Sequence, residues 1–161
     1  MMLGSAPKVT VGNMSRYKVA IISASWHKDI CDSLVDGARR ALINAGVTTE
    51  ATIYVPGSFE LPLAAQYALD AGADAAVVLG VVVRGETPHF DYVCQGVTDG
   101  IMKVSLERNK PIGFGVLTVD NLEQAVARSG VPGSKEDKGY DAAVAALELL
   151  RVANDFGGIQ G

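Results

Sequence analysis

The chain has 161 residues, of which 48% are hydrophobic and 20% are charged, so it has enough apolar material for the core of one domain and is not expected to be disordered. It carries 14 basic and 18 acidic residues, a formal net charge of −4, with no block of five like charges, which disfavours a nucleic-acid groove and a basic membrane patch. Its longest apolar stretch, residues 75–83, is far shorter than the roughly 20 residues that a membrane-spanning helix needs.

The first 15 residues are small and polar, with no sustained period and no signal-peptide pattern. We therefore expect residues 1–15 to be a flexible N-terminal arm that a partner can order, and residues 16–161 to form a single domain. Cys31 and Cys94 lie far apart, in no CxxC or Cys/His cluster, which favours neither a disulfide framework nor a zinc site and fits the reducing cytoplasm. Both are expected on helices, as small apolar residues rather than nucleophiles.

Beyond the arm, short β-branched runs alternate with stretches in which apolar residues recur every three or four positions. The expected strands are 17–23, 49–55, 75–83 and 112–119, and the expected helices are about 30–45, 61–69, 88–109, 122–128 and 143–150. Gly46 and Gly72 are expected to end the first two helices. Residues 75–83 are apolar without alternation, which indicates a central strand covered on both faces, and residues 129–138 are expected to form an irregular connector.

Repeated units of a strand followed by a helix, with short joints, predict parallel strands connected by right-handed crossovers. The expected class is α/β, a three-layer α/β/α arrangement with a flavodoxin-like, doubly wound, four-stranded parallel sheet. In such sheets, ligands bind beyond the carboxyl ends of the strands, where helix N-termini present free amides.

Aromatic residues gather at these expected strand ends. Of four phenylalanines and one tryptophan, only Phe156 falls elsewhere, and the others are Trp26, Phe59, Phe90 and Phe114. The grouping indicates a binding surface for a flat ring, with the alternative that these side chains only cap the sheet edge.

The segment from Gly80 to Thr87 nearly matches the phosphate loop of nucleotide hydrolases, but Glu86 replaces its lysine. An acidic group there would repel a triphosphate, and Gly80 lies inside an expected strand, so an NTPase is rejected. What remains is Gly85 followed by the start of a helix, where backbone N–H groups can hold a single phosphate if the Glu86 carboxylate points away.

His89, in the first turn of the expected third helix and close to Asp91, is suited to proton transfer near neutral pH, or is a capping or surface histidine. His27 has no further ligand spacing around it and is interpreted as structural. Arg128 and Lys138 flank the connector; each is a surface charge by default, yet well placed to meet an anion if the last helices fold over a neighbouring strand end. The residues alone thus indicate an α/β enzyme that uses acid/base chemistry without a metal on a heterocyclic and a phosphorylated compound.

Five segments in chain order resemble the 6,7-dimethyl-8-ribityllumazine synthase family: 26–27, 56–60, 79–93, 113–118 and 123–128. The resemblance spans about residues 17–150, and the block over 80–93 is its most specific part. It implies the penultimate step of riboflavin biosynthesis, in which 5-amino-6-(D-ribitylamino)uracil condenses with 3,4-dihydroxy-2-butanone 4-phosphate and releases water and phosphate, without a cofactor or a metal.

The resemblance also implies a role for each matching residue. It makes His89 the general acid/base and lets Trp26 stack on the pyrimidine. The ribityl chain and the ring edge would be held by Ser58, Phe59 and Glu60, and the uracil would contact the backbone of Val81, Val82 and Val83 together with Phe114 of the neighbouring subunit. The phosphate would rest on the amides of Glu86 and Thr87 and on Arg128 from across the interface, with Lys138 nearby.

Members of this family form homopentamers, some of which pack further into decamers or 60-subunit shells. Shell-forming relatives typically have a short connector with a Gly-x-Lys-x-Gly-Asn-Lys-Gly-like run, whereas residues 130–139 here are longer and contain proline, so we expect free pentamers. The arm around residues 9–11 is expected to add an edge strand to the adjacent subunit.

Two other interpretations of the sequence are a flavin-binding module and an inactive shell protein. A flavin-binding module of flavodoxin type needs a Ser/Thr/Gly-rich phosphate loop after the first strand, and residues 23–29 do not provide one. An inactive structural shell protein would not need His89, Arg128 or the aromatic group.

Overall fold

The computed structural model describes residues 12–49 and 51–157. Its elements, in chain order, are β1 (Val19–Ala24), α1 (Lys28–Asn44), β2 (Ile53–Val55), the 3₁₀ helix η1 (Ser58–Glu60), α2 (Leu61–Asp70), β3 (Ala75–Val83), α3 (His89–Arg108), β4 (Ile112–Val119), α4 (Leu122–Val126) and α5 (Lys138–Gly157). No helix of this described part is long and apolar enough to cross a membrane.

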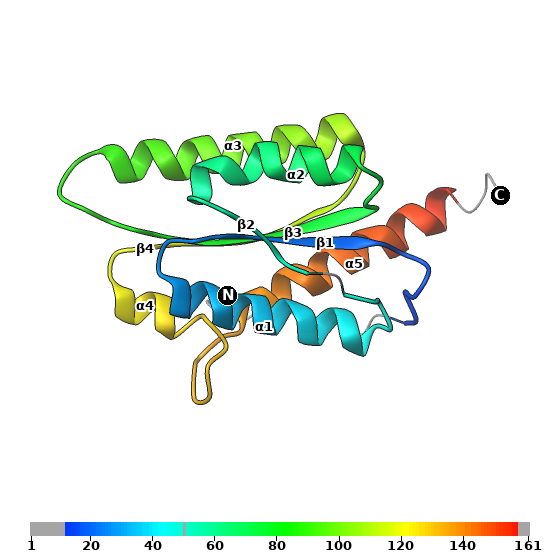
Figure 1. The fold of residues 1–161 in the computed structure, drawn as a ribbon, viewed down its shortest axis with the longest axis horizontal. Coiled ribbons are helices and arrows are strands. Elements are labelled where there is room, and N and C mark those ends of the chain that lie inside the picture. Colours follow the sequence, from blue (N-terminus) through cyan, green and yellow to red (C-terminus); the bar gives the residue numbers. More distant parts are fainter. Residues whose placement is uncertain (1–11, 50, 158–161) are drawn as a thin grey trace.

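The strands form one sheet in the order β2-β1-β3-β4, and every pair is parallel. Helices α2 and α3 cover one face of this sheet, and α1, α4 and α5 cover the other (Figure 1). The expected three-layer α/β/α arrangement is thereby confirmed. The loops after β1, β3 and β4 all lie at one end of the sheet, which is the end where the candidate site was expected (Figure 1).

The core lies on both faces of β3. Val77 and Leu79 pack with α1 and α5, whereas Ala76 and Val78, which alternate with them along the strand, pack with α2 and α3. Every residue from Ala75 to Val81 is buried, as the unbroken apolar run predicts for a central strand.

The outer element β2 differs most from the expectation. The expected strand 49–55 contains four β-branched residues, but within the described residues only Ile53–Val55 forms a strand, paired with Ile22–Ala24. β1 extends back to Val19, beyond its last residue paired with β2, so the described residues just before Ile53 diverge from β1, and propensity alone does not reveal that divergence. Similarly, α4 ends at Val126, two residues earlier than expected, because the chain turns there into the connector.

Two further expectations concern the ends of the chain and the cysteines. Cys31 is fully buried, and burial raises the pKa of its thiol, which supports its interpretation as a small core residue; Cys94 is half-buried. Met14, within the expected arm, is buried in the core and its N–H donates to the carbonyl of Ala45. The edge strand expected around residues 9–11 lies outside the described residues.

Candidate active site

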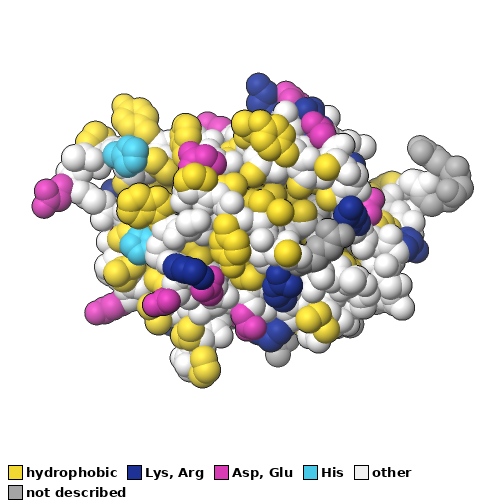
Figure 2. Space-filling view, viewed as in Figure 1, with side chains coloured by type: hydrophobic (Ala, Val, Ile, Leu, Met, Phe, Trp, Pro, Cys, Tyr) yellow, Lys and Arg dark blue, Asp and Glu magenta, His cyan; other side chains and the backbone are white. Residues whose placement is uncertain are grey.

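A cavity of about 700 Å³ opens at the carboxyl ends of β1 and β3, bounded by η1 and the start of α3. It brings together eleven residues that the sequence analysis singled out for a site: Trp26, Ser58, Phe59, Glu60, Val81, Val82, Val83, Gly85, Thr87, His89 and Phe90. Figure 2 shows the histidines at this end of the molecule, with hydrophobic side chains between and around them. The cavity therefore has aromatic walls, a backbone edge and a titratable side chain.

The end of β3 supplies the backbone edge. Its pairing with β1 stops at Leu79, whereas its pairing with β4 continues to Val83. Val82 and Val83 thus have no partner strand on the β1 side within the described chain, and their polar backbone groups there are available to a ligand. A planar ring with amide-like edges, such as a pyrimidine, matches such donors and acceptors.

The turn before α2 supplies the polar side chains. The Ser58 hydroxyl is buried and has no hydrogen-bond partner in the described structure, and it lies so close to Gly80 that a side chain on Gly80 would overlap it. Glu60 accepts a hydrogen bond from the Gly57 N–H at 2.9 Å, which fixes one carboxylate oxygen and leaves the other for a ligand. A buried hydroxyl without a partner carries a free-energy cost that a bound polyol would remove.

The start of α3 supplies a place for an anion. Within the described chain, the N–H groups of Gly85, Glu86 and Thr87 have no hydrogen-bond partner. They precede a helix of 20 residues, whose N-terminus carries roughly half a positive charge. His89 is the first residue of this helix and is exposed, so both a phosphate and a proton donor can lie at the same helix end.

Arg84 ties this loop to its neighbour, which the sequence analysis missed. Its Nε lies 2.8 Å from Asp120 Oδ1 in the loop after β4, and its guanidinium lies 4.5 Å from the centre of the Phe90 ring. The hydrogen bond to Asp120 raises the pKa of Arg84, which keeps the guanidinium charged. No sequence signal indicated this contact, because Arg84 and Asp120 lie on loops that only the parallel pairing of β3 and β4 brings together.

Four nominated residues do not line the cavity in the described chain: Glu86, Phe114, Arg128 and Lys138. Phe114 was expected near the carboxyl end of its strand, and this was wrong: it is the third residue of β4 and pairs with Val78, well before Val83. The expected bounds of the strand, 112–119, match β4, so the error lay in assigning its third residue to the carboxyl end.

Arg128 and Lys138 come together elsewhere, beside α4 and the start of α5. Both lie within ion-pair distance of Glu136, and α4 packs on the sheet face opposite α3 (Figure 1). The described chain thus carries two separate halves of the nominated site. One half has the aromatic cavity and His89, and the other has the two cations.

The cavity also includes residues without a nominated role, among them His27, Tyr92 and Val93. His27 has left-handed backbone angles at the start of α1, and its carbonyl accepts the N–H groups of Ile30 and Cys31. Tyr92 and Val93 lie in the first turn and a half of α3 together with His89, so helical spacing from His89 is the signal that would have found them.

A larger hollow of about 960 Å³ lies between α2 and the β1–β2 edge, next to the first cavity. Its lining is mostly apolar and includes the exposed side chains of Ile53, Leu63 and Tyr67, and hydrophobic side chains fill this region in Figure 2. Phe59 and Glu60 line both hollows. The first cavity is the better candidate for chemistry, because Gly85 and Thr87, whose amides are free, line it together with His89.

Comparison with known proteins gives a consistent result. A family model described as 6,7-dimethyl-8-ribityllumazine synthase matches residues 16–154 of the chain. Proteins of that name from Streptomyces coelicolor and Paenarthrobacter aurescens are 54% and 56% identical to the chain over 142 residues, which is 88% of the chain and 88% of each relative. One from Clavibacter michiganensis is 56% identical over 133 residues, 83% of the chain and 82% of the relative.

Proposed function

The chain belongs to the 6,7-dimethyl-8-ribityllumazine synthase family, and from this we propose that the cavity at the ends of β1 and β3 is its active site. The protein condenses 5-amino-6-(D-ribitylamino)uracil with 3,4-dihydroxy-2-butanone 4-phosphate to 6,7-dimethyl-8-ribityllumazine, releasing phosphate and water. This reaction is the penultimate step of riboflavin biosynthesis.

The pyrimidine substrate occupies the aromatic part of the cavity. Trp26 stacks on its ring, and the backbone of Val82 and Val83 hydrogen-bonds to its polar edge. The end of the β1–β3 pairing at Leu79 supports this role, because it leaves these backbone groups without a strand partner on the β1 side of the described chain. The ribityl chain passes Ser58 and Glu60, where its hydroxyl groups give the buried Ser58 hydroxyl the partner that it lacks.

The phosphorylated substrate places its phosphate on the amides of Glu86 and Thr87, before α3. Arg128, with Lys138 beside it, reaches the same phosphate from a second copy of the chain. The separation of the two cations from the cavity within one chain supports this division. Phe114 of the second copy closes the ring pocket in the same way.

The second copy belongs to a homopentamer. Besides the divided site, the apolar hollow beside α2 supports self-association, because Ile53, Leu63 and Tyr67 leave large apolar surfaces exposed on a single chain. We take the number of subunits, five, from the homopentamers that members of this family form. We place the enzyme in the cytoplasm, since both Cys31 and Cys94 are free thiols; fractionation of the producing cells tests this location.

In the reaction, a neutral amine of the pyrimidine attacks the ketone and forms an imine with loss of water. Phosphate is then eliminated, and the resulting enol tautomerises to a ketone. The second nitrogen attacks this ketone and closes the ring with loss of a second water. His89 moves protons in these steps. Holding the two reactants in register lowers the activation barrier by roughly 7–11 kcal/mol. This is a larger effect than the 10²- to 10⁴-fold rate increase that a general acid/base typically adds.

The observation that carries the site assignment is the shared cavity of Trp26, Ser58 and His89 beside three free amides. Its test is to mix both substrates with wild-type protein and with Trp26→Ala, and to follow the fluorescence of the lumazine. We expect product with wild type and a raised KM for the pyrimidine with the variant. An unchanged KM for the pyrimidine would contradict this use of the cavity.

A further inference from the structure

A buried carboxylate lies between the two cations that are assigned to the phosphate. The Glu136 side chain is only 5% exposed, with Oε2 at 3.4 Å from Arg128 Nε and Oε1 at 3.1 Å from Lys138 Nζ. Oε1 accepts no hydrogen bond in the described structure, so its contact with Lys138 is one of charge rather than of directed bonding. Burying a carboxylate destabilises the folded protein unless nearby cations compensate its charge.

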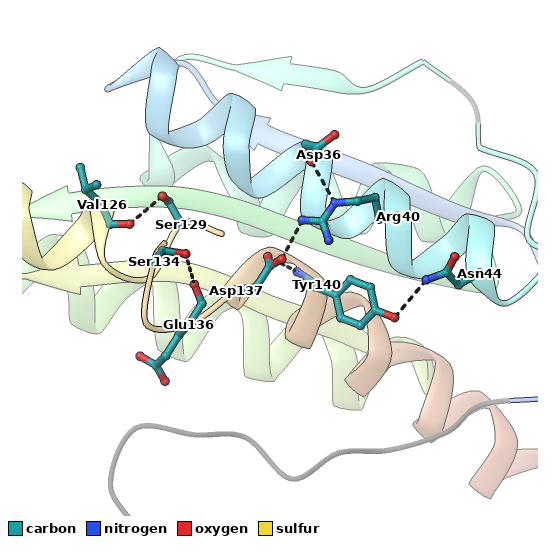
Figure 3. Close-up of polar contacts among 9 residues, drawn as sticks. All are labelled: Asp36, Arg40, Asn44, Val126, Ser129, Ser134, Glu136, Asp137 and Tyr140. Carbon is teal, nitrogen blue, oxygen red and sulfur yellow. Dashed lines mark hydrogen bonds and ion pairs between the residues drawn. The ribbon is translucent and has the colours of Figure 1, made fainter. Parts of the chain in front are cut away.

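The connector is folded so that Glu136 has little freedom. The Glu136 N–H donates to the Ala127 carbonyl, and the Glu136 carbonyl accepts the Gly130 N–H and the Ser134 hydroxyl. The next residue, Asp137, points to the opposite side and binds Arg40 of α1 at 2.7 Å (Figure 3). Neighbouring carboxylates thus have separate tasks: Asp137 ties the connector to α1, and Glu136 faces the cations.

The side chains of Arg128 and Lys138 contact the protein on one side and solvent on the other. Arg128 donates from Nη1 to the Gln124 carbonyl at 2.9 Å, and its Nε faces Glu136. The Arg128 and Lys138 side chains are 35% and 34% exposed, so each keeps a face toward solvent. Two cations this close repel each other, and a carboxylate buried beneath them removes the repulsion while leaving the outer face positive.

We propose that Glu136 is a positioning residue that holds Arg128 and Lys138 as one convergent pair for the phosphate of the phosphorylated substrate. The inference rests on the proposed function, which assigns both cations to that phosphate. Glu136 does not touch the substrate. Its carboxylate sets the direction and spacing of the groups that do.

The test is steady-state kinetics of Glu136→Gln, which keeps the shape and removes the charge. We expect the KM for the phosphorylated substrate and the inhibition constant of inorganic phosphate to rise about tenfold, with kcat and the KM for the pyrimidine within about twofold of wild type. Glu136→Asp keeps the charge on a shorter side chain, so its KM for the phosphorylated substrate should lie between those of wild type and Glu136→Gln. If Glu136 merely competed with the phosphate, Glu136→Gln would lower both constants, and that result, or no change, overturns the proposal.

Asp137→Asn is the matched control, because it weakens the tie to Arg40 on the same connector. It should lower the melting temperature and leave the KM for the phosphorylated substrate unchanged. If Glu136→Gln does not assemble, the Asp variant decides, and a wild-type KM there contradicts the proposal. Arg128→Ala distinguishes failure of the proposed function from failure of this inference. An unchanged KM for the phosphorylated substrate in Arg128→Ala refutes the assignment of Arg128 to the phosphate. A raised KM in Arg128→Ala, together with a wild-type KM in Glu136→Gln, refutes only the role of Glu136.

Discussion

His89 shows what a single side chain contributes to this site. It is exposed at the first position of α3, beside the free amides of Glu86 and Thr87, so it can exchange protons with a phosphorylated substrate and with water. In the proposed site several other groups hold the reactants, and most of the rate enhancement should come from that alignment.

We therefore predict that His89→Ala lowers kcat by about 10²-fold and leaves measurable activity. The KM for the phosphorylated substrate should change little, because the amides and not the imidazole hold the phosphate. Initial rates of lumazine formation, with the melting temperature as a check on folding, measure this. Wild-type kcat in the variant would show that His89 moves no proton in the slow step, and complete loss of activity would show that alignment contributes less than stated.

Helix α5 shows how packing between elements positions the cations. Gly139, one residue after Lys138, lies against the backbone of Leu34 in α1, so closely that a Cβ would overlap the Leu34 carbonyl. The close approach fixes the start of α5 against α1, and with it the base of the Lys138 side chain.

Gly139→Ala should therefore destabilise the protein by about 1–3 kcal/mol, although glycine to alanine inside a helix is usually stabilising. Gly157→Ala, near the other end of α5 and with no atom within 4 Å of its added Cβ, is the control and should be neutral or slightly stabilising. Denaturant unfolding of both variants compares them. Equal stability of the two would mean that α1 and α5 separate easily at Gly139.

Some elements were predictable because their signals are local. The bounds of β3 follow from an apolar run that ends at Arg84, and Gly46 and Gly72, both with positive φ, end their helices as expected. The length of β2 depends on pairing with β1, which no local pattern reports. Glu136 was missed for the same reason, because an acidic residue in a polar connector becomes a buried counterion only once the connector has folded back.

At the scale of the whole molecule, we expect the connector to influence how copies assemble. Residues 129 and 137 form an antiparallel bridge, and Gly130 and Gly133 both have positive φ, so the segment closes into a loop that projects beside α4 (Figure 1). From the sequence we expect this loop to be longer than the connector of shell-forming relatives, and we expect the extra length to change the direction of α5 relative to them. Further packing of pentamers should then be blocked.

We predict a sedimenting species of about five times the chain mass of 16.8 kDa. Sedimentation equilibrium over a range of protein concentrations measures it. A 60-subunit particle would contradict the effect assigned to the connector, and a stable monomer would contradict the divided active site as well.

The divided site is the central claim, and mixing two defective subunits tests it most directly. His89→Ala retains Arg128, and Arg128→Ala retains His89, so co-expression in equal amounts should rebuild intact sites wherever the two variants meet in the right order. Random mixing predicts about a quarter of wild-type activity, far above either variant alone. If His89 and Arg128 act within one chain, every site keeps a defect, and the mixture will show only the average of the two variants.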